Sequence, residues 1–297
     1  MTSHKLSIII LSFNTARLTK QTIDSIYENT ILKTEKFEII VLDNASSDES
    51  VKMLKILQSK HKNLTLIESA ENTGFSKGNN RAAKHARGTY LLFLNSDIIV
   101  KSKAIDQLLT RIKSLPEGDF VGGKLLNEDS SEQASCGPFY SLPVIFGALF
   151  LKGDHWGLTR YSPQETRQVD WVSGACIMTS KKTFEHMGGF DEDIFMYMEE
   201  IDLLYRSSQK GYNTYFIPEA QFVHLGSASS DGKSFPIIQV YRGFLYFYKK
   251  HGNRFQQAMV KRMLQLKAQI AILVGKLLGK PHIVETYAKA QKLVELA

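Results

Sequence analysis

Four short apolar segments recur within the first hundred residues, and each is followed by polar side chains. These segments are Leu6–Phe13, Phe37–Leu42, Leu64–Glu68 and Tyr90–Leu94. Continuous apolar, β-branched runs of this length are typical of strands buried on both faces of a parallel sheet. The intervening residues predict helices over Thr15–Asn29, Glu49–His61 and Arg81–Ala86. The alternation predicts an α/β, Rossmann-like fold with a mostly parallel central sheet and helices on both faces.

The polar residues that follow these strands are candidate ligand-binding residues. They are Ser12, Asn14, Asp43, Asn72, Gly74, Gly78, Asn79, Asn95, Ser96 and Asp97, with Asn72–Asn80 expected to form a glycine- and asparagine-rich loop. Open α/β sheets bind ligands beyond the carboxyl ends of their strands, and glycines let backbone amides approach a ligand. Residues 1–98 are therefore predicted to be a nucleotide-binding half. Neither GxGxxG nor GxxxxGK[ST] is present, which disfavours dinucleotide oxidoreductases and P-loop enzymes.

The second half of the chain is less regular and contains the densest carboxylate cluster. Residues 118–150 predict an irregular, pocket-forming region, and Val169–Thr179 predicts a strand in which Gly174 allows a close approach. Glu199, Glu200 and Asp202 then precede a helix expected over Leu203–Lys210. A late strand is expected over Asn213–Ile217, with His224 downstream of it.

Six stretches, in order over residues 6–230, resemble the family 2 glycosyltransferases of the GT-A fold, in particular the rhamnosyltransferase-like branch. They are SIIILSFN, VLDNASSD, ENTGFSKGNN, YLLFLNSD, WVSGACIMTSKKTFEHMGGFDEDIFMYMEEIDLLYR and FVHLGSAS. The resemblance implies inverting transfer of a sugar from a nucleoside diphosphate to an acceptor hydroxyl. It also implies a divalent cation, Mn²⁺ or Mg²⁺, which would neutralise the diphosphate leaving group as a Lewis acid. We expect a GT-A domain over residues 1–235, with an acceptor-binding half over 99–235.

The resemblance also assigns roles to individual residues. Asp97 falls on the family's DXD metal motif, in which Asn95 replaces the first aspartate, and His224 matches the late histidine that completes the metal's coordination. Glu200 falls on the general base, where the family carries aspartate, and Glu199 is the second candidate. Asp43 matches the aspartate that contacts the nucleobase.

The remaining candidates concern the acceptor side of the site. Asp202 is expected to support the site or to cap the following helix, and Gly174 to lie beside it. Of the two tryptophans, Trp171 is the better acceptor-site candidate, although both Trp156 and Trp171 are more often core or pocket wall.

The identity of the substrates stays open at this level. The branch favours dTDP-rhamnose, but related enzymes use UDP-sugars, and the expected acceptor is a glycan or a lipid-linked glycan of bacterial polysaccharide synthesis. A non-catalytic nucleotide-sugar-binding subunit is the alternative, supported by the departures at Asn95 and Glu200. A sugar nucleotidyltransferase is disfavoured because the first loop lacks a glycine-rich, basic sequence.

Charge is concentrated at the C-terminal end of the 297-residue chain, whose formal net charge is +7. Residues 249–292 hold ten Lys and Arg against a single acid, Glu285. We expect residues 236–297 to form a basic, amphipathic helical appendage that packs on the domain or another subunit, or contacts anionic membrane peripherally. Nucleic acid is not expected as a partner, because no recognised binding module accompanies the charge.

Compartment signals predict a cytoplasmic protein, with possible peripheral contact at the inner face of the cell membrane. The N-terminus lacks a signal-peptide pattern, and no apolar run approaches the roughly 20 residues of a membrane span. The longest run is Pro143–Leu151. Cys136 and Cys176 are too few for a disulfide framework and are expected to be buried thiols.

Overall fold

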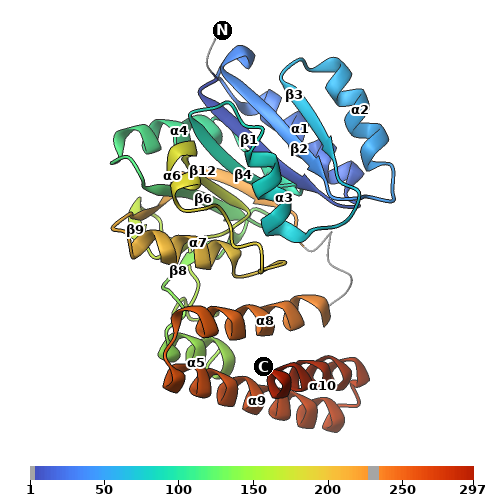
Figure 1. The fold of residues 1–297 in the computed structure, drawn as a ribbon, viewed down its shortest axis with the longest axis vertical. Helices are drawn as coiled ribbons and strands as arrows, with labels where there is room; N and C mark the ends of the chain where they lie inside the picture. Colours follow the sequence, from blue (N-terminus) through green and yellow to red (C-terminus); the bar gives the residue numbers. More distant parts are fainter. Residues whose placement is uncertain (1–3, 227–233) are drawn as a thin grey trace.

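The computed structural model describes residues 4–226 and 234–297, and places the four apolar segments side by side in one sheet (Figure 1). This ten-stranded sheet contains β1 (Leu6–Ser12), β2 (Phe37–Asp43), β3 (Leu64–Glu68), β4 (Tyr90–Asn95), β5 (Ile98–Val100), β6 (Phe120–Leu126), β7 (Glu132–Gln133), β9 (Arg167–Val169), β11 (Cys176–Ser180) and β12 (Thr214–His224). A separate pair is formed by β8 (Cys136–Gly137) and β10 (Trp171–Val172).

The order across the large sheet is β3-β2-β1-β4-β11-β6-β12-β5. The strands from β3 to β4 are parallel to one another, as the sequence predicts. β11 lies antiparallel between β4 and β6, whereas β12 runs parallel to β6. The fold is therefore an α/β fold in which the first four strands, β1 to β4, are all parallel.

Helices cover both faces of the sheet. The α-helices of the described residues are α1 (Ala16–Asn29), α2 (Ser50–Lys60), α3 (Gly74–Ala83), α4 (Ala104–Ser114), α5 (Leu142–Phe150), α6 (Lys181–His186), α7 (Glu199–Ser208), α8 (Ser234–His251), α9 (Arg254–Leu277) and α10 (Pro281–Leu296). Successive side chains of β1 alternate between two cores: Ile8 and Ile10 pack with α1, α2 and α4, whereas Ile9 packs with α3, α6 and α7. Burial of both faces of β1, β2 and β4 explains why their sequences are largely apolar.

Several segments differ from the sequence-based prediction. The expected loop Asn72–Asn80 is largely helical, and α3 spans Gly74–Ala83 instead of Arg81–Ala86. Gly78 faces β1, because a Cβ at this position would lie 2.5 Å from Leu11 Cδ1. This glycine therefore permits close helix–sheet packing, and its approach to a ligand stays a prediction.

The prediction for residues 118–150 missed a central strand, β6, in which every residue is buried. The prediction failed because Gly122 and Gly123 interrupt the run of apolar, β-branched residues by which a buried strand is identified in a sequence. A Cβ on either would lie within 2.6 Å of Val172 or Phe222 side-chain atoms, so glycine is required by packing.

The expected strand Val169–Thr179 is divided among β9, β10 and β11. A turn closed by the Cys176 N–H bond to the Ser173 carbonyl (3.1 Å) interrupts it. The helix expected over Leu203–Lys210 begins at Glu199, so the carboxylate cluster lies in its first turn.

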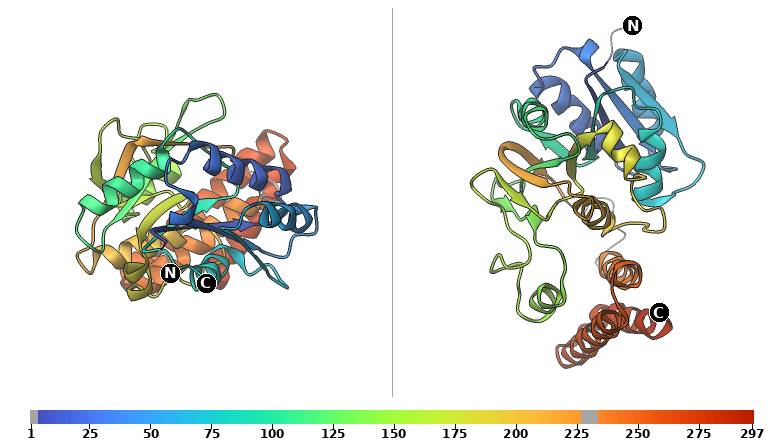
Figure 2. Two further views of the ribbon diagram at one scale, coloured as in Figure 1. Left: turned by 90° about the horizontal axis from the view of Figure 1, so that it is seen from above. Right: turned by 60° about the vertical axis from the view of Figure 1, so that its left-hand side comes forward.

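The C-terminal helices α8, α9 and α10 pack together below the sheet, and α5 packs against α9 (Figures 1 and 2). The appendage is thus confirmed as helical. The segment 227–233 lies outside the described residues, and with it the end of the FVHLGSAS motif. The boundaries predicted at residues 98 and 235 stay predictions.

None of the helices in the described residues is long and apolar enough to cross a membrane. Cys136 and Cys176 are buried and free.

Candidate active site

The carboxyl ends of β1, β2 and β4 bring most of the predicted donor-site residues together. Asp43, at the end of β2, is almost completely buried. Its Oδ1 accepts a hydrogen bond from the Ser46 N–H (2.9 Å), whereas Oδ2 has no partner among the described residues. A buried carboxylate oxygen without a donor is costly, so this position suits a ligand N–H group.

Asn44 holds the loop that leads into α3. Its Nδ2 donates to Asn72 Oδ1 (2.8 Å), and its Oδ1 accepts from the Thr73 N–H (3.1 Å). Asn72 Oδ1 also accepts from the Gly74 N–H (3.0 Å), so the side chain of Asn72 is engaged in positioning this turn. Gly74 has φ +81°, and a Cβ there would lie 2.5 Å from the Phe195 carbonyl oxygen. Sequence reasoning missed Asn44, because its amide acts on backbone distant in the chain.

Ser12, Asn14, Asn79 and Ser96 are positioned by local hydrogen bonds. Ser12 bonds Thr19 through their hydroxyls (3.1 Å), and Asn14, with φ 53°, accepts from the Ser47 N–H (2.8 Å). Asn79 donates to the Phe75 carbonyl within α3, and the Ser96 hydroxyl accepts from Thr15. The Asn95 N–H donates to the Ala175 carbonyl. Asn14 is exposed at the strand ends, whereas Ser12, Asn79 and Ser96 are buried and contribute mainly to the frame of the site.

Asp97 and His224 lie side by side, as the family resemblance implies, with His224 Nε2 3.4 Å from Asp97 Oδ1. His224 Nδ1 lies 2.7 Å from Gln133 Oε1, an acceptor, which assigns the Nδ1 proton and leaves the Nε2 lone pair facing Asp97 in the neutral ring. Two acceptors that face each other are stabilised by a cation or a proton between them. The pair therefore fits a divalent cation.

The described residues contain no group of three or more His, Cys, Asp or Glu side chains arranged to hold a metal. A cation at Asp97 and His224 would therefore draw its other ligands from a bound substrate or from water. A mixed nitrogen and oxygen donor set of this kind suits Mn²⁺.

The two candidate bases, Glu199 and Glu200, begin α7 immediately after a strained turn. Tyr197 and Met198 have φ values of 66° and 76°, a left-handed conformation that side chains with a Cβ rarely adopt. Gly243 of α8 packs directly on this turn, since a Cβ there would lie 2.5 Å from Met198 Cγ. Helix α8 thus supports the backbone turn that positions the side chains of Glu199 and Glu200.

The carboxyls of Glu199 and Glu200 are electrostatically distinct. Burial, followed by the neighbouring Glu200 charge, raises the pKa of Glu199 well above its usual value. Burial also raises the pKa of Glu200, but the Arg160 charge and the Gly174 backbone partly oppose this rise. In each glutamate the Oε2 atom is buried and has no hydrogen-bond partner among the described residues. Of the two carboxyls, Glu200 is therefore the one whose ionised form is opposed less.

Gly174 and Trp171 form the wall beside Glu200. A Cβ at Gly174 would lie 3.6 Å from Glu200 Cδ, so the glycine lies directly against the carboxyl group. Trp171 is only 1% exposed, its indole N–H donates to the Pro138 carbonyl (2.8 Å), and Tyr140 stacks at 6.1 Å. Trp171 therefore has a supporting position and offers no open face on which an acceptor could stack.

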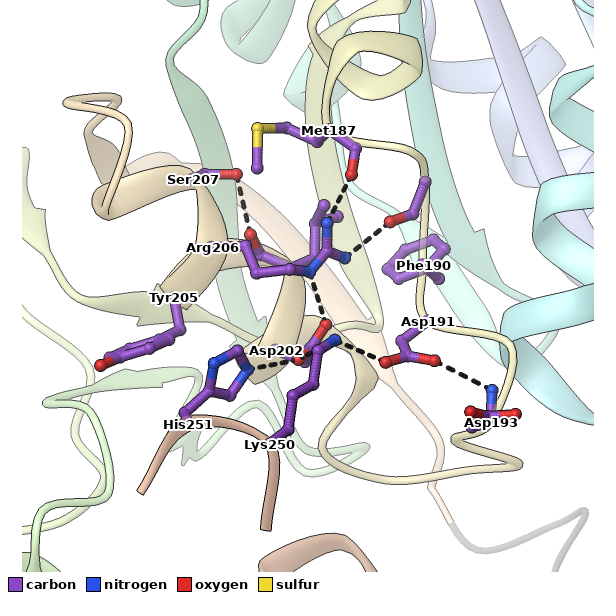
Figure 3. Close-up of polar contacts among 12 residues, drawn as sticks. Met187, Phe190, Asp191, Asp193, Asp202, Tyr205, Arg206, Ser207, Lys250 and His251 are labelled. Atoms are coloured by element: carbon purple, nitrogen blue, oxygen red, sulfur yellow. Dashed lines mark hydrogen bonds and ion pairs between the residues drawn. The ribbon is translucent and has the colours of Figure 1, made fainter. Parts of the chain in front are cut away.

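Asp202, in the first turn of α7, is completely buried in a charge cluster (Figure 3). Its carboxylate accepts from Arg206 Nε (2.7 Å) on the same helix, and from Lys250 Nζ (2.8 Å) and His251 Nε2 (2.7 Å) at the end of α8. Lys250 also bonds Asp191 in the loop before α7. Asp202 therefore joins α8 to α7, and its Lys250 and His251 partners are visible only in the tertiary structure.

The described residues thus combine a GT-A-like α/β fold with a buried aspartate at the end of β2, an Asp–His pair and a glutamate pair at the start of α7. A family model described as glycosyl transferase family 2 matches residues 7–186. The chain belongs to glycosyl transferase family 2 and is a glycosyltransferase.

Relatives with known names and solved structures agree with this membership. The chain is 27% identical over 214 residues to N-acetylglucosaminyl-diphospho-decaprenol L-rhamnosyltransferase of Mycobacterium tuberculosis, covering 65% of this chain and 68% of that protein. It is 30% identical over 224 residues to rhamnosyltransferase WbbL of Escherichia coli K12, covering 72% and 81%. Its fold resembles that of a mannosyltransferase from Pyrobaculum calidifontis solved with GDP-Man and Mn²⁺, with a TM-score of 0.58, 20% identity and coverage of 99% and 75%.

Proposed function

We propose that the protein is an inverting glycosyltransferase that transfers a sugar, with rhamnose favoured, from a dTDP- or UDP-sugar to a hydroxyl of a glycan or lipid-linked glycan in bacterial polysaccharide synthesis. The names of the two rhamnosyltransferase relatives support the sugar. The observation that supports the chemistry is the buried glutamate pair, in which the Arg160 charge and the Gly174 backbone favour ionisation of Glu200 over Glu199. A non-catalytic binding subunit would have no use for such a pair.

In this proposal Glu200 accepts the proton of the acceptor hydroxyl. The resulting oxygen forms a bond to the anomeric carbon of the donor while the bond from that carbon to the diphosphate oxygen breaks, and the diphosphate departs on the opposite face. Attack from the face opposite the leaving group inverts the anomeric centre. Asp43 binds the nucleobase through its free Oδ2, and the glycine-led start of α3 lines the donor pocket.

Asp97 and His224 would hold Mn²⁺ or Mg²⁺ together with the diphosphate. A divalent cation in this position supplies charge neutralisation to the departing diphosphate. Gln133 orients the His224 ring so that Nε2 points to the cation position.

We also propose peripheral contact with anionic lipid through α9. Phe255, Met259, Leu266, Ile270, Leu273 and Leu277 are exposed and recur at intervals of three, four or seven residues, so they share one face. The helix carries five Lys and Arg and no acid. If two copies packed together through this face, their Lys and Arg side chains would repel one another. An anionic lipid surface would instead attract these positive charges. Nucleotide sugars are cytoplasmic metabolites, so we assign the inner face of the membrane.

The test of the transferase proposal is the variant Glu200→Gln. Without the base, transfer from dTDP- or UDP-sugar in the presence of Mn²⁺ should fall by about 10²–10⁴-fold. Binding of the nucleoside diphosphate, measured as the rise that it causes in the thermal midpoint, should be unchanged. Transfer at the wild-type rate by Glu200→Gln would overturn the assignment of the base. Glu199→Gln serves as the matched control, because it replaces a carboxyl that we expect to be neutral already.

A further inference from the structure

The side chain that accepts the Nδ1 proton of His224 stands at the end of a short hairpin, residues 127–133. The turn of this hairpin is closed by a backbone bond from the Asn127 N–H to the Ser131 carbonyl (2.8 Å). Its second strand, β7, pairs antiparallel with β6 and ends at Gln133. The hairpin is therefore tied to the central sheet, and it holds the Gln133 amide beside the histidine.

A chain of side-chain hydrogen bonds runs through this hairpin and starts at Asp129. The Ser131 hydroxyl donates to Asp129 Oδ1 (2.6 Å), and the Ser131 N–H donates to the same oxygen (2.9 Å). The hydroxyl bond, followed by the N–H bond, lowers the pKa of Asp129, so this carboxyl is ionised and can only accept. Ser131 therefore commits its single hydroxyl proton to Asp129 and presents only lone pairs to its other neighbour.

Two amides carry this polarity from Ser131 to His224. Asn127 Nδ2 donates to Ser131 Oγ (2.9 Å), so Asn127 Oδ1 is directed to Gln133 and accepts from its Nε2 (3.0 Å). Gln133 Oε1 then lies 2.7 Å from His224 Nδ1. If the Asn127 amide were turned over, its oxygen would meet the Ser131 lone pairs and its N–H₂ group would meet that of Gln133, so neither bond would form. The direction of every bond thus follows from the acceptor at Asp129.

The direction of the chain decides which nitrogen of His224 carries the proton. With Gln133 Oε1 as the acceptor, the proton lies on Nδ1, and the Nε2 lone pair faces Asp97 Oδ1 at 3.4 Å. With the Gln133 amide reversed, its N–H would donate to Nδ1, and the ring proton would lie on Nε2 facing Asp97. A proton between His224 and Asp97 would occupy the position in which both could bind a cation. One tautomer therefore suits a cation site and the other does not.

We propose that three side chains of the 127–133 hairpin hold His224 in its metal-binding tautomer. They are the positioning residues Asp129, Ser131 and Asn127. They act through Gln133 and do so from the protein surface, since the hairpin tip is exposed. Outer-shell partners of a metal-binding histidine fix its tautomer and ring orientation, and their loss typically weakens metal affinity by about 10–100-fold. The inference rests on the cation site of the proposed transferase.

Nitrogen-15 NMR of the metal-free protein tests the tautomer directly, because protonated and unprotonated ring nitrogens of histidine give different signals. The His224 signals are identified by their absence in His224→Gln. At a pH above the ordinary range of histidine titration, the wild type should show a protonated Nδ1 and an unprotonated Nε2. Asn127→Leu frees the Gln133 amide to turn over and should lose this single tautomer. Asn127→Asp keeps an acceptor for Gln133 Nε2 and should retain it.

Metal affinity gives a second measurement. Mn²⁺ is titrated into protein saturated with UDP or with dTDP, and the rise in the thermal midpoint reports its binding. Asn127→Leu should weaken Mn²⁺ binding by about tenfold, whereas Asn127→Asp should bind as the wild type does. Ser130→Ala is the matched control, because Ser130 is exposed at the same hairpin tip and its hydroxyl has no hydrogen bond in the described residues. The hairpin should persist in these variants, since Glu132 stays bonded to the nearly buried Lys124 at 2.5 Å.

Ser131→Ala serves where the leucine variant does not fold, because it removes one exposed hydroxyl and leaves Asn127 free to turn over. A wild-type His224 ring protonated on Nε2 would overturn the proposal, as would a single Nδ1-protonated tautomer in both Asn127→Leu and Ser131→Ala. Mn²⁺ affinity of Asn127→Leu within about twofold of the wild type would also overturn it and leave the transferase intact. Failure of the transferase proposal is distinguishable, because it would appear as no stabilisation by nucleotide and Mn²⁺, while the NMR result in the metal-free protein would be unaffected.

Discussion

Replacing Asp202 with asparagine removes the charge on which Arg206, Lys250 and His251 converge. The Asp202 carboxylate is completely buried, and its three bonds to these basic side chains measure 2.7–2.8 Å. Removing one partner of a buried ionic cluster typically costs about 3–5 kcal/mol, because the remaining charges are left uncompensated. At about 2–4 °C per kcal/mol, the thermal midpoint should fall by about 6–20 °C.

Urea unfolding at neutral pH measures this loss directly, and Asp193→Asn is the matched control. Asp193 belongs to the same cluster but is exposed, and Tyr246 donates to it at 3.2 Å, so its replacement should change the unfolding free energy by less than about 0.5 kcal/mol. Because α8 supports the turn before Glu199, kcat should also fall in Asp202→Asn while the affinity for nucleotide is kept. A loss of stability below about 1 kcal/mol in Asp202→Asn would refute the reasoning.

The pH dependence of this effect has a definite sign. Burial raises the pKa of Asp202, but the Lys250 hydrogen bond, the Arg206 charge and the His251 hydrogen bond outweigh it, so the folded-state pKa is lowered. The carboxylate therefore stabilises the fold above the unfolded aspartate pKa of about 3.9, and this contribution is lost as the pH falls through the lower folded-state value. The difference between wild type and Asp202→Asn should accordingly shrink in acid.

Three further predictions concern the site and the appendage. Because the glutamate pair has raised pKa values, kcat should rise with pH and reach a plateau only above the usual carboxyl range; a rate independent of pH from 4.5 upward would contradict the assignment of Glu200. Gly74→Ala should weaken nucleotide binding in calorimetry and lower the thermal midpoint, since its Cβ would meet the Phe195 carbonyl at positive φ, and unchanged binding would mean that the α3 start is not part of the donor pocket. Leu266→Asp with Leu273→Asp should abolish sedimentation with anionic vesicles but leave transfer to a water-soluble acceptor unchanged, whereas retained sedimentation would exclude the exposed face of α9.

The order of strands and helices in the nucleotide-binding part follows from local sequence. β1 to β4 were predicted within one or two residues, because uninterrupted β-branched runs have few alternatives to burial in a parallel sheet. The meeting of Asp97 with His224 was predicted only through family resemblance, since 126 residues separate them in the chain and no local pattern relates them. The glycine-containing strand β6 was missed because glycines weaken the strand pattern of a sequence. Their reason is the packing of Val172 and Phe222 against them, and that is visible only in the tertiary structure.

The sequence by itself determined the α/β class, the positions of the polar strand ends and the carboxylate types available for chemistry. Tertiary structure decided which of these side chains are buried, paired or free. Asp202 and Glu200 begin the same helix two residues apart, yet one is enclosed by basic side chains of α7 and α8 while the other keeps an unpartnered oxygen beside Gly174. The physical reason is that solvation and charge partners come from distant segments, and these fix the role of a carboxyl group more than its place in the chain does.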